Sequence, residues 1–379
     1  MKIQFPREKL SHAFHMAAAI AGTSTTKDIL KNVKFEAKEG NLGIFTATDM
    51  RVGIRTEVPD IVVHSPGSIL LPPDRFSSIL RECVEETLEM HDDGRKTRIW
   101  GTRSEFNLPS ESPSGFPELP VFEASAYHEI STRLFRESIR RTVFATDAES
   151  GRFALAGVAF EFDEAEMTAV ATDGRRLAVQ RGPATAVNGG ILAGSLIIVP
   201  GKALTLIERA LSDDDVNVHV CARENEILIR GGRTIVHARL VEGRFPRWTD
   251  VLPSGGEISR VELPVGPFFA AVRQSCIVLP DKYYGVDFRF GAGKLVLACH
   301  GAERGESTVE MPISFDEPEI SIIFDTKYLN DFLRIMDPSK TLTLELRRGK
   351  AAAVFTTDDG YSYVLMPLST KSEVKTAQS

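Results

Sequence analysis

Apolar and polar residues follow one order that occurs three times along the chain. Each occurrence opens with apolar residues at the spacing of an amphipathic helix, at residues 5–21, 130–146 and 263–278. Alternating segments typical of half-buried strands come next, at residues 33–36, 158–161 and 286–289. The pattern therefore predicts an opening helix and then strands, three times over.

A second landmark lies further along each occurrence. It combines an apolar strand, a turn or cap, and an amphipathic helix of about three turns. The apolar helix positions are Phe76, Ile79 and Leu80, then Leu204, Ile207 and Leu211, then Leu329, Phe332, Leu333 and Met336. One repeat thus reads strand, helix, three strands, strand, helix, three strands. This order favours an α+β fold with antiparallel sheets over a doubly wound parallel sheet.

A short motif marks the same place in each occurrence. Residues 46–51 read Thr-Ala-Thr-Asp-Met-Arg, residues 170–175 read Val-Ala-Thr-Asp-Gly-Arg, and a fainter echo at 297–302 reads Leu-Ala-Cys-His-Gly-Ala. The copies lie about 125 residues apart, which is the size of a domain and not of a solenoid unit. We expect three domains of one fold, at residues 1–122, 123–253 and 254–379, the last with a polar tail at 369–379.

Composition narrows the class of protein. Of the 379 residues, 42% are hydrophobic, enough for full cores. No run approaches the ~18 apolar residues of a membrane span, and the first residues lack a signal-peptide core, so we expect a cytoplasmic protein with no membrane partner.

The four cysteines lack metal-ligand spacing, and we expect buried, reduced thiols at Cys83, Cys221, Cys276 and Cys299. Without an HExxH pattern or a Walker-type glycine loop, we expect no metal and no cofactor.

The distribution of charge matters more than the total. A net charge of −7 by itself speaks against nucleic-acid binding. However, Arg133, Arg136 and Arg140 share one helical face, with Arg141 beside them. The other predicted helices carry fewer basic residues, namely Arg7, His12, His15, Arg75, Arg81, Lys202, Arg209, Arg273, Lys327 and Arg334. Acidic residues gather in turns instead. A mildly positive surface lined by helices suits contact with phosphates without reading of bases. Ordinary solvated faces explain any single helix better than this does, and they explain the six helices together equally well.

Asp49 and Asp173 occupy the same position in two repeats. Such a pair suggests catalytic carboxylates. An Asp at a strand end followed by Gly174 is more typical of a turn in which the carboxylate binds backbone amides. The third copy has His300 there, which a shared catalytic role would not tolerate easily. We therefore expect no catalytic residues.

Three motifs within this threefold pattern resemble those of a known family. Ala-Thr-Asp-Gly-Arg-Arg-Leu-Ala at 171–178, Val-Glu-Gly-Arg-Phe-Pro-Arg-Trp at 241–248 and the weaker Tyr-Val-Leu-Met-Pro-Leu at 363–368 resemble the bacterial DNA polymerase III beta subunit, the sliding clamp. The resemblance runs from Met1 to about Leu368. It implies a head-to-tail dimer: a ring of six similar domains with helices inside and antiparallel sheets outside.

The resemblance also implies function and partners. A clamp is a processivity factor that encircles duplex DNA without reading sequence, slides, and tethers the replicative polymerase. The implied partners are DNA, a second copy of the chain, a clamp loader, the DNA polymerase III catalytic subunit, and other polymerases and repair proteins with clamp-binding motifs. These partners place the protein in the bacterial cytoplasm, at the nucleoid.

The resemblance places a hydrophobic cleft for partner peptides between the second and third domains. Carried over by position, the cleft comprises Leu155, Thr172, Gly174, Arg175, Arg176, Leu177, Pro246, Val251, Val364, Met366, Pro367 and Leu368. Apolar pockets suit the Leu or Phe anchors of a short peptide. Arg175 departs from the His common at its position and adds a charge at the rim.

Dimer and DNA contacts follow from the same resemblance. Phe106 and Leu108 of the first domain should meet the helix end at Ile277 and Val278 of the third, and exposed sheet edges should pair there. The expected DNA-contacting residues are Lys27, Arg152, Phe153 and Lys202. Lys27 substitutes for a basic residue common near Ser24, and Glu149 replaces a neutral DNA contact.

Two other classes of protein stay open on the residues alone. An enzyme could use Asp173 and Arg176 in a cleft, on a phosphorylated substrate. A repeat scaffold without a DNA role would share the threefold pattern. A clamp differs from both in forming a dimer and in depending on closed DNA.

Overall fold

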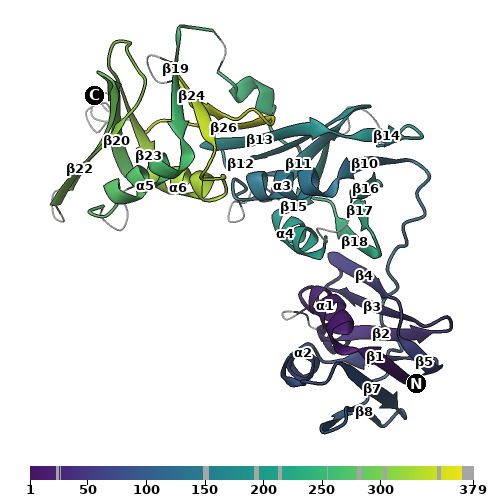
Figure 1. The fold of residues 1–379 in the computed structure, drawn as a ribbon. Helices are drawn as coiled ribbons and strands as arrows, with labels where there is room; N and C mark the ends of the chain where they lie inside the picture. Colours follow the sequence, from purple (N-terminus) through teal and green to yellow (C-terminus); the bar gives the residue numbers. More distant parts are fainter. Residues whose placement is uncertain are drawn as a thin grey trace. The chain divides into compact units, whose positions relative to one another are not determined.

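The computed structural model describes residues 1–22, 25, 27–147, 153–191, 196–211, 216–253, 255–279, 284–301, 305–347 and 351–368 (Figure 1). Across these ranges, no helix is long and apolar enough to cross a bilayer. The residues group into two compact units. Unit 1 comprises Met1–Arg136, Phe162–Ala165 and Ala184–Val241, and unit 2 comprises Glu137–Glu161, Glu166–Pro183 and the described residues from Glu242 onward. The expected central domain contributes to both units, and the three-domain boundaries stay a prediction.

The helices and strands follow the predicted order three times. The first stretch contains β1 (Lys2–Pro6), α1 (Arg7–Ala18), the 3-10 helix η1 (Asp28–Lys31), β2 (Val33–Lys38), β3 (Leu42–Thr48), β4 (Val52–Val58), β5 (Val62–Ser65), β6 (Gly67–Leu71), α2 (Pro73–Glu82), β7 (Thr87–Asp92), β8 (Lys96–Trp100) and β9 (Glu105–Pro109). The second contains β10 (Tyr127–Ser131), α3 (Thr132–Val143), η2 (Phe153–Ala156), β11 (Gly157–Phe162), β12 (Glu166–Thr172), β13 (Arg176–Pro183), β14 (Thr185–Val187), β15 (Leu196–Pro200), α4 (Gly201–Ala210), β16 (Asn217–Ala222), β17 (Glu226–Gly231) and β18 (Thr234–Arg239). The third, preceded by η3 (Trp248–Val251), contains β19 (Ile258–Pro264), α5 (Val265–Ser275), β20 (Gly285–Gly291), β21 (Lys294–Gly301), β22 (Gly305–Pro312), β23 (Ile320–Asp325), α6 (Thr326–Arg334), β24 (Thr341–Arg347), β25 (Ala353–Thr356) and β26 (Tyr361–Leu365). The α+β prediction is confirmed; the short strands β5 and β14 were not predicted.

Strand order repeats as well as element order. The neighbours β1-β7-β8-β9, β10-β16-β17-β18 and β19-β24-β25-β26 recur in one arrangement, and so do β2-β3-β4, β11-β12-β13 and β20-β21-β22. Every pairing for which register is resolved is antiparallel, for example β12 with β13 and β20 with β21. The repeat seen in sequence is therefore a repeat of topology.

Edge strands of successive stretches pair with each other in a regular way. In unit 1, β4 from the first stretch pairs with β18 from the second, and in unit 2, β13 from the second pairs with β26 from the third. The corresponding strands left over are β22 and β9. Among the described strands, each of these two has a neighbour on one side only.

Aromatic side chains fill the cores under the helices. In unit 1, α1 and α2 lie side by side (Figure 1), and the ring of Phe14 lies 4.7 Å from Phe76 and 5.5 Å from Phe45 of β3. In unit 2, Phe332 of α6 stacks on Tyr363 of β26 at 4.4 Å. Each core thus joins helices to sheets through contacts between aromatic rings.

The opening helices begin later than the apolar pattern predicts. Phe5, Ile130 and Leu263 were expected to be helical, but they are buried strand residues in β1, β10 and β19. In two of the three, the next residue is a proline, Pro6 or Pro264, in extended geometry. Proline disfavours helical geometry in the residue before it, so the strand continues to that point and the helix starts after it.

The junction between β4 and β18 depends on a glycine. Gly53 pairs with His237, and a β-carbon at Gly53 would clash with the His237 ring. Because His237 is only 9% exposed, the ring has little room to move. Gly53→Ala should lower the free energy of unfolding by about 1–3 kcal/mol through overpacking. Urea titration of the variant measures this change.

The double variant Gly53→Ala/His237→Ala provides the control. Removing the ring removes the closest clash and leaves the Leu119 methyl, 2.9 Å from the added β-carbon, so Gly53→Ala should cost less in the His237→Ala background than in the wild type. Equal costs in both backgrounds would mean that the ring is not what excludes a side chain at position 53.

Candidate functional site

The Thr-Asp motif at 171–176 forms a turn at the end of β12. The Asp173 carboxylate oxygen Oδ1 accepts from the amides of Arg175 at 2.9 Å and Arg176 at 3.1 Å. Gly174 has a φ of 87°, a left-handed conformation that glycine adopts without strain. The Thr172 hydroxyl accepts from the Gly174 amide and donates to the Arg176 carbonyl. The turn interpretation of Asp173 is confirmed.

The first repeat builds the same turn from the same residue types. Asp49 Oδ1 accepts from the amides of Arg51 and Val52, both at 2.8 Å, and the Thr48 hydroxyl bonds the Val52 carbonyl. Met50, at φ 75°, stands where the second repeat has glycine. In the third repeat, the side chain of His300 lies outside the described residues. The aspartates therefore shape turns, and Asp173 also binds Arg176.

Arg176 is the buried charge beneath this turn. Its side chain is 7% exposed and forms ion pairs with Asp173 at 3.0 Å and Asp331 at 2.9 Å. Its guanidinium also donates to the Phe144 carbonyl and lies 4.5 Å from the centre of the Tyr328 ring. Burial acts to lower the pKa of Arg176, but its neighbours outweigh burial and raise the pKa. The charge is thus fully compensated inside unit 2.

An apolar pocket of about 370 Å³ opens above Arg176, entirely within unit 2. All the predicted cleft residues except Pro367 and Leu368 line it: Leu155, Thr172, Gly174, Arg175, Arg176, Leu177, Pro246, Val251, Val364 and Met366. Residues far apart in the sequence meet here because β13 pairs with β26, which aligns Leu177 with Val364. We call it the cleft pocket.

Trp248 lines the cleft pocket and was not predicted. Its indole nitrogen donates to Glu161 at 3.0 Å, and Arg181 lies 5.3 Å from the ring centre. These contacts fix η3, which carries Val251 at the pocket rim. The signal was available, because Trp248 closes the second motif and a large aromatic is a common pocket wall.

Pro367 and Leu368 lie beyond the cleft pocket. Both are half-buried, and the Leu368 amide donates to the Ile323 carbonyl at 2.8 Å. The chain thus leaves the pocket wall after Met366 and follows β23. The predicted tail, residues 369–379, lies outside the described part of the chain.

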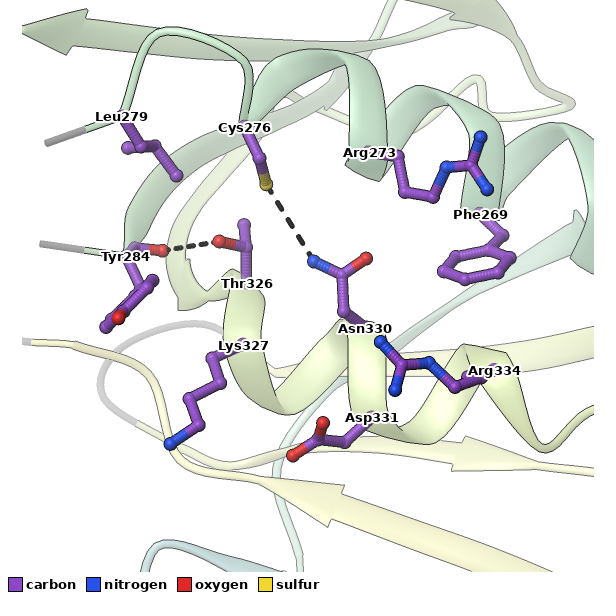
Figure 2. Close-up of a pocket in the computed structure, with 10 residues that line it drawn as sticks. All are labelled: Phe269, Arg273, Cys276, Leu279, Tyr284, Thr326, Lys327, Asn330, Asp331 and Arg334. Carbon is purple, nitrogen blue, oxygen red and sulfur yellow. Dashed lines mark hydrogen bonds between the residues drawn. The ribbon is translucent and has the colours of Figure 1, made fainter. Parts of the chain in front are cut away.

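Three exposed cations gather between α5 and α6. Figure 2 shows Arg273 from α5 and Lys327 and Arg334 from α6 around a pocket of about 690 Å³. Asp331 also lines this pocket, but its carboxylate pairs with Arg176. The pair compensates the acid, which leaves the exposed cations to set the sign of the local potential.

The predicted DNA-contacting residues are placed as follows. Lys27 is exposed just before η1, and Lys202 is exposed in the first turn of α4. Arg152 lies outside the described residues, as do Ser24 and Glu149, and only the backbone of Phe153 is described, at the start of η2. The positive end of the α4 dipole adds to the charge of Lys202.

Two basic residues in the predicted set have structural roles instead. Arg7 donates to the carbonyls of Leu80 at 2.8 Å and Glu85 at 3.1 Å, which caps the end of α2. Arg141 is buried and binds Asp359 through two bonds of 2.9 Å and 2.8 Å. Neither can serve a solvent-facing surface, because each is committed to a partner within its own unit.

Arg136 lies on α3 as predicted, but a neighbouring acid offsets its positive charge. It forms an ion pair with Glu208 of α4 at 3.4 Å, whereas Arg133 and Arg140 are exposed.

The burial of the cysteine thiols differs from the prediction in one case. Cys83, Cys221 and Cys299 are buried, but Cys276 is half-buried and lines the pocket of Figure 2.

The predicted dimer residues lie at or beside the leftover edge strands. Phe106 and Leu108 belong to β9, with Leu108 9% exposed. Ile277 follows α5 and is 79% exposed, one of the most exposed large apolar side chains. A side chain at Gly305, where β22 begins, would contact Val278 at 3.9 Å. An apolar helix end and a free strand edge are therefore neighbours in unit 2.

Models of two domains of one family match the chain. The DNA polymerase III beta subunit N-terminal domain matches residues 1–120, and its central domain matches residues 129–247, together more than half of the chain. The beta sliding clamp of Pseudomonas putida is 27% identical, over 97% of this chain and 100% of its own. That of Chlamydia muridarum is 26% identical, over 97% and 99%.

Solved structures share the fold. The sliding clamp of Bacillus subtilis has a TM-score of 0.88 at 22% identity, over 98% of this chain and 99% of its own. A Pseudomonas aeruginosa clamp bound to griselimycin has a TM-score of 0.88 at 24% identity, over 98% and 100%. The repeated topology and the full-length matches define the class of DNA sliding clamps. The chain belongs to the DNA polymerase III beta subunit family, whose members are non-catalytic processivity subunits.

Proposed function

We propose that two copies of the chain close head to tail into a ring around duplex DNA, in the bacterial cytoplasm. The observation that supports this proposal is the regular way in which edge strands of successive stretches pair. The third strand after the opening helix of one stretch pairs with the last strand of the next stretch, β4 with β18 and β13 with β26, which leaves β22 and β9. Pairing β22 of each copy with β9 of the other repeats this pattern and satisfies both free edges.

Apolar residues support the same contact. Ile277 and Val278 lie beside β22, and Phe106 and Leu108 belong to β9. Full burial of an exposed isoleucine stabilises an interface by about 1.5–3 kcal/mol. A ring closed by two identical contacts gains this amount twice.

The helices provide the DNA-facing surface of the proposed ring. Lys27, Arg152, Phe153 and Lys202 are the proposed DNA contacts, together with the three cations of Figure 2. Phosphate contacts carry no sequence information, which suits a protein that slides. A net charge of −7 keeps the total attraction low while the local potential stays positive.

The cleft pocket is the proposed docking site for the replicative polymerase, the clamp loader, and other polymerases and repair proteins. Its walls are mainly apolar, and its volume of about 370 Å³ suits one or two side chains of a short peptide. The solved complex of the Pseudomonas aeruginosa clamp with griselimycin supports a ligand site on this fold. Arg175, exposed at the rim, should favour an acidic residue in the docked peptide.

Retention on circular DNA tests the ring. The free protein should elute on gel filtration as a dimer of about twice 41.7 kDa. After addition of a clamp loader, ATP and nicked circular DNA, it should elute with the DNA. Linearising the DNA should release it, because only a threaded ring depends on DNA ends. Equal retention on circular and linear DNA would mean ordinary binding without encirclement.

Removing the three cations of Figure 2 tests the DNA-facing surface. Arg273→Ala, Lys327→Ala and Arg334→Ala together should remove about two to three phosphate contacts. The affinity for DNA should therefore fall less steeply as the salt concentration rises. The readout is the slope of log affinity against log salt for a duplex oligonucleotide, measured by fluorescence anisotropy. An unchanged slope would exclude the α5–α6 surface from the DNA contact.

A further inference from the structure

The pocket between α5 and α6 combines cations with aromatic rings. It lies entirely within unit 2, has a volume of about 690 Å³, and is lined by Phe269 and Tyr284 as well as by the three cations (Figure 2). Phe269 is half-buried, and Tyr284 is 41% exposed. A cavity of this size is in the range of sites that enclose a small ligand. We call it the helix pocket.

The helix pocket is positively charged. Its three cations are exposed, and none of them forms an ion pair with another described residue. Asp331 is the one acid among the described lining residues, and its carboxylate pairs with Arg176 at 2.9 Å. Residues 280–283 lie outside the described part of the chain, and the formal charges of Asp281 and Lys282 within them cancel. An anionic ligand is therefore favoured.

The aromatic lining points to more than phosphate. The bases of a duplex are stacked inside it, so cations alone suffice to contact its backbone. An unpaired nucleotide instead exposes a planar base, which stacks on aromatic side chains and on arginine guanidinium groups. The helix pocket offers both kinds of surface. The Arg273 guanidinium lies 5.4 Å from the centre of the Phe269 ring, and Tyr284 lies on the other side of Asn330 (Figure 2).

We propose that the helix pocket binds a single nucleotide, with its base against Phe269 and Tyr284 and its phosphate against the three cations. Two sources offer this chemistry, namely an unpaired nucleotide within a DNA strand and a free nucleoside phosphate. The proposal rests on the proposed DNA-facing role of the three cations and deepens it, because it gives the surface between α5 and α6 a ligand that a fully paired duplex does not present.

Short labelled strands test the contribution of the base. A five-nucleotide thymidine strand and an abasic strand of the same length carry the same phosphates, so only the bases differ. With full-length protein at equal ionic strength, the thymidine strand should bind about five- to thirtyfold tighter, as expected for one stacked base. Fluorescence anisotropy measures both affinities. Equal affinities would overturn the nucleotide site and leave phosphate contacts only.

The variant Phe269→Leu/Tyr284→Leu keeps the lining apolar and removes both rings. The preference for the thymidine strand should fall below about twofold, while affinity for the abasic strand stays within about twofold of wild type. Trp100→Leu is the matched control, because Trp100 of unit 1 is half-buried and has the Arg98 guanidinium 4.8 Å from its ring centre. It should leave the preference unchanged. A preference that survives the loss of Phe269 and Tyr284 places the base elsewhere and overturns the proposal.

The thiol of Cys276 locates the ligand in the unaltered protein. Cys276 lines the helix pocket and is half-buried, whereas Cys83, Cys221 and Cys299 are buried. At about ten times its Kd, the thymidine strand should slow alkylation of Cys276 by N-ethylmaleimide about tenfold, because about nine-tenths of the molecules are occupied. The abasic strand at the same concentration should slow it less than about threefold. Mass spectrometry measures the rates.

A third arm of this experiment distinguishes the two sources. Slowing by thymidine triphosphate as well as by the strand assigns the helix pocket to nucleotides in general, and slowing by the strand alone assigns it to unpaired DNA. No slowing by either overturns the proposal. Equal retention on circular and linear DNA would overturn the ring alone, since a five-nucleotide strand needs no ring to bind.

Discussion

Ile277→Asp with Val278→Asp should convert the dimer into a monomer of 41.7 kDa. In the proposed ring, both side chains enter the contact between the helix end and β9 of the other copy. A carboxylate buried there without a partner costs at least ~2 kcal/mol. Because the ring contains the contact twice, the dimer should weaken by at least ~4 kcal/mol, about a thousandfold. Analytical ultracentrifugation across a concentration series measures the change.

The same variant should also fail to stay on circular DNA, since a monomer cannot encircle it. Its fold should be largely retained, because Ile277 is 79% exposed and Val278 is only half-buried within the single chain. Val216→Asp is the matched control: Val216 is 81% exposed, in unit 1, and its replacement should leave the dimer intact. A dimer that persists at low-micromolar concentration in the double variant would remove these residues from the interface.

The Thr-Asp motif shows what sequence determines locally. A threonine, an aspartate and a residue that tolerates positive φ suffice to build the turn, so the motif predicted its own hydrogen bonds. The same holds for element order, because apolar periodicity separates helices from strands wherever the segments are long enough. Such features need no knowledge of distant contacts.

Element boundaries and charge roles depend on contacts that periodicity does not contain. Phe5 satisfies a helical pattern and a strand pattern at once, and the geometry around Pro6 decides between them. Arg7 and Arg141 look like surface cations in sequence. They are structural because Leu80 and Asp359, far along the chain, provide their hydrogen-bond acceptors.

The cleft was predicted through family resemblance and not through physics of the sequence. Leu177 and Val364 are adjacent only because β13 pairs with β26, and nothing in either segment specifies that pairing. Trp248 was missed although it closes a quoted motif, because its role depends on Glu161 and Arg181. Pocket walls assembled from three distant segments are thus the least predictable part of this site.

Val251→Asp with Met366→Asp should abolish partner docking while the dimer stays intact. Both side chains are nearly half exposed, so the fold loses little apolar packing. A docked peptide, however, would bury its Leu or Phe anchor against two carboxylates, which lose hydration without gaining a partner. Affinity for a short synthetic peptide with a Leu-Phe anchor should fall by more than about a hundredfold, as expected when the apolar centre of an interface is lost.

Primer extension on a long circular template gives the functional readout. The double variant should be retained on circular DNA as well as wild type, yet it should not increase product length, because the ring no longer holds the polymerase. Val62→Asp with Val121→Asp is the matched control, since these valines of unit 1 are 44% and 43% exposed and do not line the cleft pocket. Long products made with Val251→Asp/Met366→Asp would place the polymerase contact outside the cleft pocket. A variant that encircles DNA but fails to extend synthesis would show that encirclement and tethering are separate functions, one carried by strand edges and the other by an apolar pocket.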